Sequence, residues 1–98
     1  MDISNREEII ELYDLYGGLL TDKQRLYFED YYYMDLSITE IAQNYSISRN
    51  GVFDQLKRTT KLLEEYENIL KLKNKFKKIE LLEIDSSLKE KVLNILKE

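Results

Sequence analysis

The 98-residue sequence contains no cysteine and no histidine. The chain therefore has no disulfide bond, thiolate nucleophile, zinc finger or imidazole that could act as an acid or a base. Proline is also absent and only three glycines occur, so the composition favours neither a sheet-rich fold nor a flexible linker. An all-α fold is expected.

Long apolar runs are lacking as well. No stretch approaches the roughly 20 apolar residues of a membrane-spanning helix, and the N-terminal sequence MDISNREEII lacks a basic-then-apolar signal pattern. We therefore expect a cytoplasmic protein without membrane insertion. The length suffices for one modest helical core, which predicts a single domain over residues 1–98.

The most informative pattern is residues 37–62, SITEIAQNYSISRNGVFDQLKRTTKL, in a chain whose formal net charge is -4. Ser37 and Glu40 have the spacing of a capping box, in which each side chain satisfies a free backbone N–H at a helix start. Ser48 is placed to cap a second helix, and Ser46 stands in the short turn where a glycine is usual. Two capped helices joined by a short turn predict a helix-turn-helix, and a generic helical hairpin is the alternative.

Amphipathic patterns predict further helices before this motif. The first begins near residue 5 and is expected to stop at Gly17 and Gly18, because glycine supplies the left-handed conformation common just past a helix end. The second follows Thr21, with Gln24 as its capping-box partner. The helix-turn-helix core therefore covers about 21–62.

Beyond the motif, the apolar spacing predicts an unusually long fourth helix over about 49–76. A C-terminal helix is predicted over about 87–97, where Ser87 and Glu90 repeat the capping-box spacing. These helices bring the expected total to about five.

The chain is rich in tyrosine, with eight in all, and Tyr27, Tyr31, Tyr32 and Tyr33 fall within one short helix. Aromatic faces can stack on the bases of a single-stranded nucleic acid. The favoured interpretation is that these rings belong to the core and its boundary.

The predicted recognition helix supplies a candidate site for nucleic acid or a partner: Ser48, Arg49, Asn50, Phe53, Asp54, Lys57 and Arg58. Arginine and asparagine suit base reading in a major groove. Asp54 would repel phosphates, and an exposed ring such as Phe53 is more typical of a protein contact. The site is therefore less basic than a DNA-reading helix usually is.

A second candidate is a cluster of five lysines, Lys71, Lys73, Lys75, Lys77 and Lys78. These side chains could contact a nucleic-acid backbone without reading its sequence. The alternative is an ordinary solvated helix face. No nucleophile-and-base constellation or glycine-rich phosphate loop occurs, so we expect no enzyme activity, no cofactor and no metal.

The sequence resembles the YlxM (UPF0122) family of small bacterial proteins associated with the signal recognition particle. The similarity runs over residues 10–76 and is most specific in LLTDKQ (19–24), LSITEIA (36–42), ISR (47–49) and DQLKRTTKLLEEYE (54–67). The same stretch is similar to region 4 of bacterial sigma factors, within the winged-helix-like DNA-binding superfamily. Family members usually carry Gln-Ala-Val where this chain has Asn50, Gly51 and Val52.

The resemblance implies a regulatory accessory of the signal recognition particle pathway, whose partner is the particle's GTPase, its receptor or the particle RNA. A DNA-binding transcriptional regulator that uses Arg49, Asn50, Lys57 and Arg58 is the alternative. A third hypothesis is a helical interaction module without nucleic-acid contact. In that case the C-terminal stripe of Leu88, Val92 and Leu96 folds back on its own chain or forms a homodimer.

Overall fold

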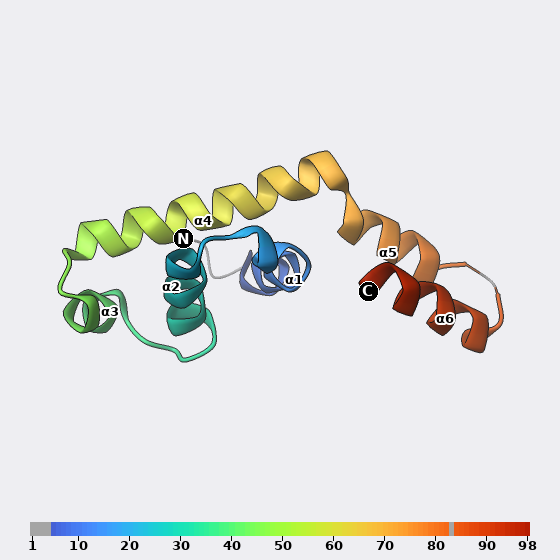
Figure 1. The fold of residues 1–98 in the computed structure, drawn as a ribbon, viewed down its shortest axis with the longest axis horizontal. Coiled ribbons are helices and arrows are strands. Elements are labelled where there is room, and N and C mark those ends of the chain that lie inside the picture. The colour runs from blue at the N-terminus through green and yellow to red at the C-terminus, as the bar shows by residue number, and fades with distance from the viewer. Residues whose placement is uncertain (1–4, 83) are drawn as a thin grey trace.

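The computed structural model describes residues 5–82 and 84–98. Over that part of the chain the elements are α1 (Arg6–Tyr16), the 3-10 turn η2 (Gly17–Leu19), α2 (Asp22–Tyr32), α3 (Ile38–Tyr45), α4 (Arg49–Leu70), α5 (Leu72–Glu80) and α6 (Ser86–Lys97). The expected all-α fold is confirmed, with six α-helices in the described residues instead of about five. Figure 1 shows α1, α2 and α3 packed along one side of α4, and the α5–α6 hairpin beyond its C-terminal end. No helix in the described ranges is both long and apolar enough to cross a membrane.

α1 ends at two glycines, but not in the predicted conformation. Gly17 has a φ of -55°, and no glycine among the described residues has a positive φ. The left-handed stop predicted for Gly17 and Gly18 is therefore wrong. The ring of Tyr13 lies over Gly17, where a Cβ would be only 3.1 Å from Tyr13 Cε2. Gly17 allows this close approach, and the chain continues through η2.

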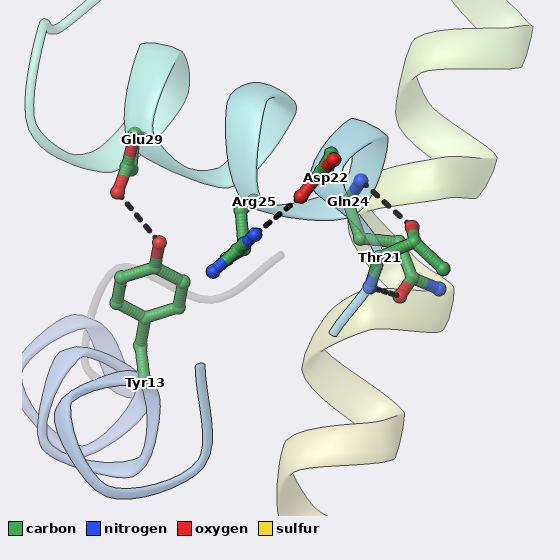
Figure 2. Close-up of polar contacts among 6 residues, drawn as sticks. All are labelled: Tyr13, Thr21, Asp22, Gln24, Arg25 and Glu29. Atoms are coloured by element: carbon green, nitrogen blue, oxygen red, sulfur yellow. Dashed lines mark hydrogen bonds and ion pairs between the residues drawn. The ribbon is translucent and has the colours of Figure 1, made fainter. Parts of the chain in front are cut away.

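Two of the three predicted capping boxes are confirmed. Thr21 Oγ1 accepts a hydrogen bond from the Gln24 N–H at 3.2 Å, and Gln24 Oε1 accepts one from the Thr21 N–H at 3.0 Å (Figure 2). The same reciprocal bonds join Ser37 and Glu40, at 3.0 and 3.2 Å. These bonds fix where α2 and α3 begin, and a cap of this kind stabilises a helix by about 1 kcal/mol.

The turn between α3 and α4 closes as the sequence predicts. Ser46 has φ 55° and ψ 43°, the left-handed conformation that glycine usually supplies in such turns. The N–H of Ile47 bonds back to the carbonyl of Ala42 at 3.0 Å. Ser48 then caps α4, because its Oγ accepts a hydrogen bond from the Gly51 N–H at 3.0 Å. The arrangement is a helix-turn-helix.

The long helix predicted over 49–76 is wrong at its C-terminal end. α4 stops at Leu70, and Lys71 has φ 55° and ψ 33°, a left-handed conformation that a helix interior does not contain. The following residues form the separate helix α5. Neither glycine nor proline marks the break, so the local sequence gave no signal for it.

Tertiary hydrogen bonds explain the break after α4. The Glu67 carboxylate accepts hydrogen bonds from the backbone N–H groups of Lys73, at 3.0 Å, and Asn74, at 3.3 Å. Both N–H groups belong to the first turn of α5, where a helix has no partner of its own for them. The Tyr16 hydroxyl accepts from the Leu72 N–H at 3.1 Å and donates to Glu67 Oε1 at 2.7 Å. α1 therefore holds the junction between α4 and α5.

The C-terminal helix begins one residue earlier than predicted. α6 spans Ser86–Lys97, and its N-cap is Asp85, whose carboxylate accepts from the Ser87 N–H at 2.7 Å. The predicted capping role of Ser87 with Glu90 is therefore wrong. An aspartate is as good a cap as serine and lies two residues earlier.

Two apolar clusters form the core. The first joins α1, α2 and α4 through Ile9, Leu12, Tyr16, Leu20, Phe28, Tyr32 and Leu63. The second joins α2, α3 and α4 through Tyr27, Ile41, Ala42, Val52 and Leu56. Because α4 contributes to both clusters, its inner face packs against α1, α2 and α3 along most of its length, and its outer face is exposed to solvent.

The crowded tyrosines of α2 mostly belong to these clusters. Tyr27 and Tyr32 are buried, which confirms the core interpretation for both. Phe28 stacks between Tyr13, at 4.1 Å between ring centroids, and Tyr32, at 4.4 Å. The Tyr13 hydroxyl donates to Glu29 Oε1 at 2.7 Å (Figure 2). The faces of these rings contact other side chains of the protein, so they do not form an exposed stacking platform.

Tyrosine ionisation should destabilise the fold above pH 10. Burial and the hydrogen bond to Glu67 raise the pKa of Tyr16 to about 12, and the hydrogen bond to Asp30, with burial, raises the pKa of Tyr45 to about 12. The unfolded chain, with tyrosine pKa values near 10, loses these protons first. The stabilisation is therefore complete below pH 10 and declines between pH 10 and 12, by up to about 1.4 kcal/mol per pH unit for each tyrosine.

Denaturant unfolding measured from pH 8 to pH 12 tests this expectation. The free energy of unfolding should fall more steeply for the wild type than for Tyr16→Phe or Tyr45→Phe, because each variant removes one titrating hydroxyl. Parallel curves for the three proteins would contradict the assignment.

Candidate nucleic-acid or partner interface

The first turn of α4 is the best-defined part of the candidate site. Ser48 caps it, and Gly51 occupies the third helical position, where an added Cβ would lie 3.1 Å from Ser48 Oγ. Alanine at this position would favour the helix by up to about 1 kcal/mol but would crowd the capping hydroxyl. The glycine thus leaves the Ser48 cap unobstructed.

All seven residues of the predicted site lie on the solvent side of α4 or at its start: Ser48, Arg49, Asn50, Phe53, Asp54, Lys57 and Arg58 are exposed. The inward positions Val52, Leu56 and Thr59 are buried. Since a helix turns by about 100° per residue, the seven exposed residues divide between two adjoining flanks.

One flank of the site borders a groove that the sequence did not reveal. Phe53, Lys57, Thr60 and Glu64 line its α4 side, and the opposite wall comes from Asn5, Ile9 and Tyr32. The groove has a volume of about 290 Å³. Phe53 is 38% exposed, so part of its ring is covered here and part remains open. The wall residues are far from α4 in the sequence, and only the packing of α1 and α2 brings them to it.

The other flank is fully outward and carries Asn50, Asp54 and Arg58. Within the described residues, no hydrogen bond or ion pair is formed by the side chain of Arg49, Asn50, Lys57 or Arg58. These polar groups are therefore available to a ligand without first breaking an internal contact.

Charge is segregated along the fold. Residues 37–63 carry four basic side chains and only two acidic ones, in a chain of net charge -4: Arg49, Lys57, Arg58 and Lys61 against Glu40 and Asp54. The acidic side of α1 lies elsewhere, since Glu8 borders a groove with Glu67 and Asn68 near the end of α4. Figure 1 likewise shows α3 at the N-terminal end of α4 and α1 farther along it. The motif is thus locally positive.

The five clustered lysines do not extend this surface. They lie in and around α5, at the far end of α4, a helix of 22 residues and hence about 33 Å long. Lys73 is already paired with Glu11 Oε2 at 3.3 Å. The other four lysines are exposed, and two of them, Lys75 and Lys78, line an apolar groove. The two basic clusters are separate surfaces.

The fold and the exposed recognition helix define a small all-α helix-turn-helix protein. The family model described as "Putative helix-turn-helix protein, YlxM / p13 like" (UPF0122) matches residues 3–97. The chain belongs to the UPF0122 family, which confirms the resemblance seen in its sequence.

Related family proteins come from several bacteria. A UPF0122 protein of Geobacillus sp. (strain WCH70) is 55% identical over 67 residues, which cover 68% of this chain and 61% of the relative. One from Shouchella clausii is 52% identical over 65 residues, 66% of this chain and 60% of the relative. One from Halalkalibacterium halodurans is 49% identical over 81 residues, which cover 83% of this chain and 72% of the relative. The matched part of this chain thus spans about 60% of the length of the first two relatives.

Proposed function

We propose that this protein is a cytoplasmic regulatory accessory of the signal recognition particle pathway, acting by binding and not by catalysis. The observation that carries the proposal is the exposed, uncommitted face of α4. It presents Arg49, Lys57 and Arg58, and Lys57 lines a groove together with Phe53. The pathway itself rests on the resemblance of the sequence to the YlxM family. The proposed partners are the particle's GTPase, its receptor or the particle RNA.

The chemistry of this face suits a protein or ribonucleoprotein partner better than duplex DNA alone. Phe53 provides a partly covered aromatic ring beside a groove, which is a typical anchor of a protein contact. Asp54 lies on the outward flank and would repel a phosphate backbone. A partner with both basic and acidic groups satisfies Arg58 and Asp54 together.

A DNA-binding transcriptional regulator remains the second candidate, favoured by Arg49 and Asn50. Both lie in the first turn of a helix capped by Ser48, which is the part of a recognition helix that enters the major groove. Arginine can pair with guanine and asparagine with adenine. The similarity to sigma-factor region 4 agrees with this reading.

Arg58→Glu should reduce capture of particle components from a lysate by at least about tenfold, which corresponds to 1.4 kcal/mol of binding free energy. The matched control is Lys91→Glu, the same charge change at an exposed position of α6. Captured protein and nucleic acid are both identified, and circular dichroism confirms that the variants fold. Equal capture by the two variants would place the binding surface outside α4.

Selection of duplex DNA from a random pool decides between the two candidates. Enrichment of one sequence, with Arg49→Ala losing about 1–3 kcal/mol of discrimination at one base pair, would support the transcriptional regulator and overturn the accessory role. No enriched sequence, together with capture of particle components, supports the accessory. A helical module without nucleic-acid contact would capture protein alone.

A further inference from the structure

The α5–α6 hairpin is joined to α4 by one residue, Lys71. None of the described residues of α5 or α6 is buried. The hairpin contains an apolar groove of about 330 Å³, and Leu81 at its tip is 81% exposed. Because α6 packs on α5, the two helices form one unit. The position of this unit on the protein depends on the junction at Lys71.

The break between α4 and α5 is confined to that residue. In a continuous helix each N–H bonds the carbonyl four residues earlier. The N–H of Lys71 still bonds the carbonyl of Glu67, at 2.8 Å, and the N–H of Lys75 bonds that of Lys71, at 3.0 Å. Lys71 itself has φ 55° and ψ 33°, a left-handed conformation that is unfavourable for a residue with a Cβ. Rotation of this one residue into the right-handed region would join α4 and α5 into a single helix.

Side chains replace the three helical hydrogen bonds that the break removes. The N–H groups concerned are those of Leu72, Lys73 and Asn74. The first bonds the Tyr16 hydroxyl at 3.1 Å, and the other two bond the Glu67 carboxylate at 3.0 and 3.3 Å. A continuous helix would give the same three groups backbone carbonyls as acceptors. The bent form and a straight form therefore satisfy the same donors in different ways.

The other contacts that hold the bend are weak. Leu72 packs against the first core cluster, and Lys73 pairs with Glu11 at 3.3 Å. The Glu11 side chain is 55% exposed, and an exposed ion pair contributes little to stability. Since the described residues of α5 and α6 are not buried, movement of the hairpin would expose little apolar surface apart from Leu72. The hydrogen bonds of Tyr16 and Glu67 are the main restraint.

The sequence across the junction favours a straight helix. Residues 52–98 contain neither glycine nor proline. Ile69, Leu72, Phe76 and Ile79 recur at steps of three and four residues, which would place them on one face of a continuous helix. The bend interrupts this stripe and leaves Ile69 77% exposed.

We propose that Lys71 is a hinge with two states, and that Tyr16 and Glu67 form a latch that holds it bent. When the latch opens, α4 and α5 become one helix over residues 49–80, about 48 Å long. Figure 1 shows that the chain bends after α4 toward the side on which α1 lies, so straightening moves the hairpin away from α1. A partner that binds one state better shifts the population toward that state. The inference does not depend on the proposed function.

Double electron–electron resonance between two spin labels tests the hinge. The chain has no cysteine, so Glu7→Cys on α1 and Ser87→Cys on α6, both at exposed positions, carry the labels without further changes. The protein with an intact latch should give mainly the shorter of two distances. In the latch variant, Tyr16→Phe with Glu67→Ala, the ratio of the longer to the shorter distance should rise at least about tenfold, with no loss of helical circular dichroism.

Lys71→Gly, added to the latch variant, tests the role of the left-handed residue. Glycine takes this conformation without strain and weakens a continuous helix, so the ratio should fall again by at least about tenfold. The matched control is Lys77→Gly, which places glycine at an exposed position within α5. It weakens the helix in both states alike and should leave the ratio unchanged.

Three results would overturn the proposal. A single distance that is the same with and without the latch excludes a hinge. Equal effects of Lys71→Gly and Lys77→Gly would show that the conformation of Lys71 does not control the bend. A broad spread of distances in the latch variant, with loss of helical circular dichroism, would show that the hairpin unfolds instead of moving on a straight helix.

Discussion

Phe28→Ala should lower the free energy of unfolding by about 3–5 kcal/mol, enough to unfold much of the protein at 37 °C. Phe28 is completely buried and lies between α1, α2 and α4. Its ring stacks on Tyr13 and Tyr32, so the variant leaves a cavity and removes both aromatic contacts. Chemical denaturation followed by circular dichroism measures the loss.

Phe53→Ala is the matched control, since the same side chain is removed from an exposed position of α4. It should change the free energy of unfolding by less than about 1 kcal/mol. If the proposed interface is right, it should nevertheless weaken capture of the partner. Similar losses of stability in the two variants would show that Phe53 belongs to the core and not to a binding surface.

Glu67→Ala should cost about 2–3 kcal/mol of stability, because hydrogen bonds to a charged group are stronger than neutral ones. Its carboxylate accepts from Tyr16, Lys73 and Asn74, and thereby joins α1, α4 and α5. Hydrogen exchange of the Lys73 and Asn74 amides should accelerate together with the loss of stability. Glu64→Ala, one turn earlier on α4 and without such bonds, should cost less than about 0.5 kcal/mol.

A double-mutant cycle of Glu67→Ala and Tyr16→Phe measures how much of this loss of stability comes from the hydrogen bond between the two side chains. The two changes should couple by at least about 0.5 kcal/mol, because both remove the same hydrogen bond. Strict additivity would mean that the Tyr16 hydroxyl does not stabilise the junction through Glu67.

The contrast between the two ends of α4 shows what local sequence can predict. Its start follows from Ser48, whose short polar side chain caps the helix with a bond to a residue three positions on. Its end does not follow from any local pattern, because Lys71 adopts a left-handed conformation without being glycine. A hydrogen bond from the Leu72 N–H to the Tyr16 hydroxyl stabilises that conformation, and these two residues are 56 positions apart in the sequence.

The candidate site divides in the same way. The exposure of Arg49, Asn50 and Arg58 follows from helical periodicity once the buried positions Val52 and Leu56 are recognised. The groove beside Phe53 could not be predicted, because its opposite wall comes from the start of α1 and the end of α2. Likewise, the sequence shows a run of lysines, but not that Lys73 is paired with Glu11.

The sequence by itself determined the helix-turn-helix, the caps of α2, α3 and α4, and the outward face of the recognition helix. Caps and periodicity act over three or four residues, so they can be seen in the chain without its fold. Only the tertiary structure decided where α4 ends, how the groove forms and how the α5–α6 hairpin exposes its apolar groove and tip. These features depend on contacts between residues far apart in sequence, and hydrogen bonding and packing at such contacts override the local preference for a continuous helix.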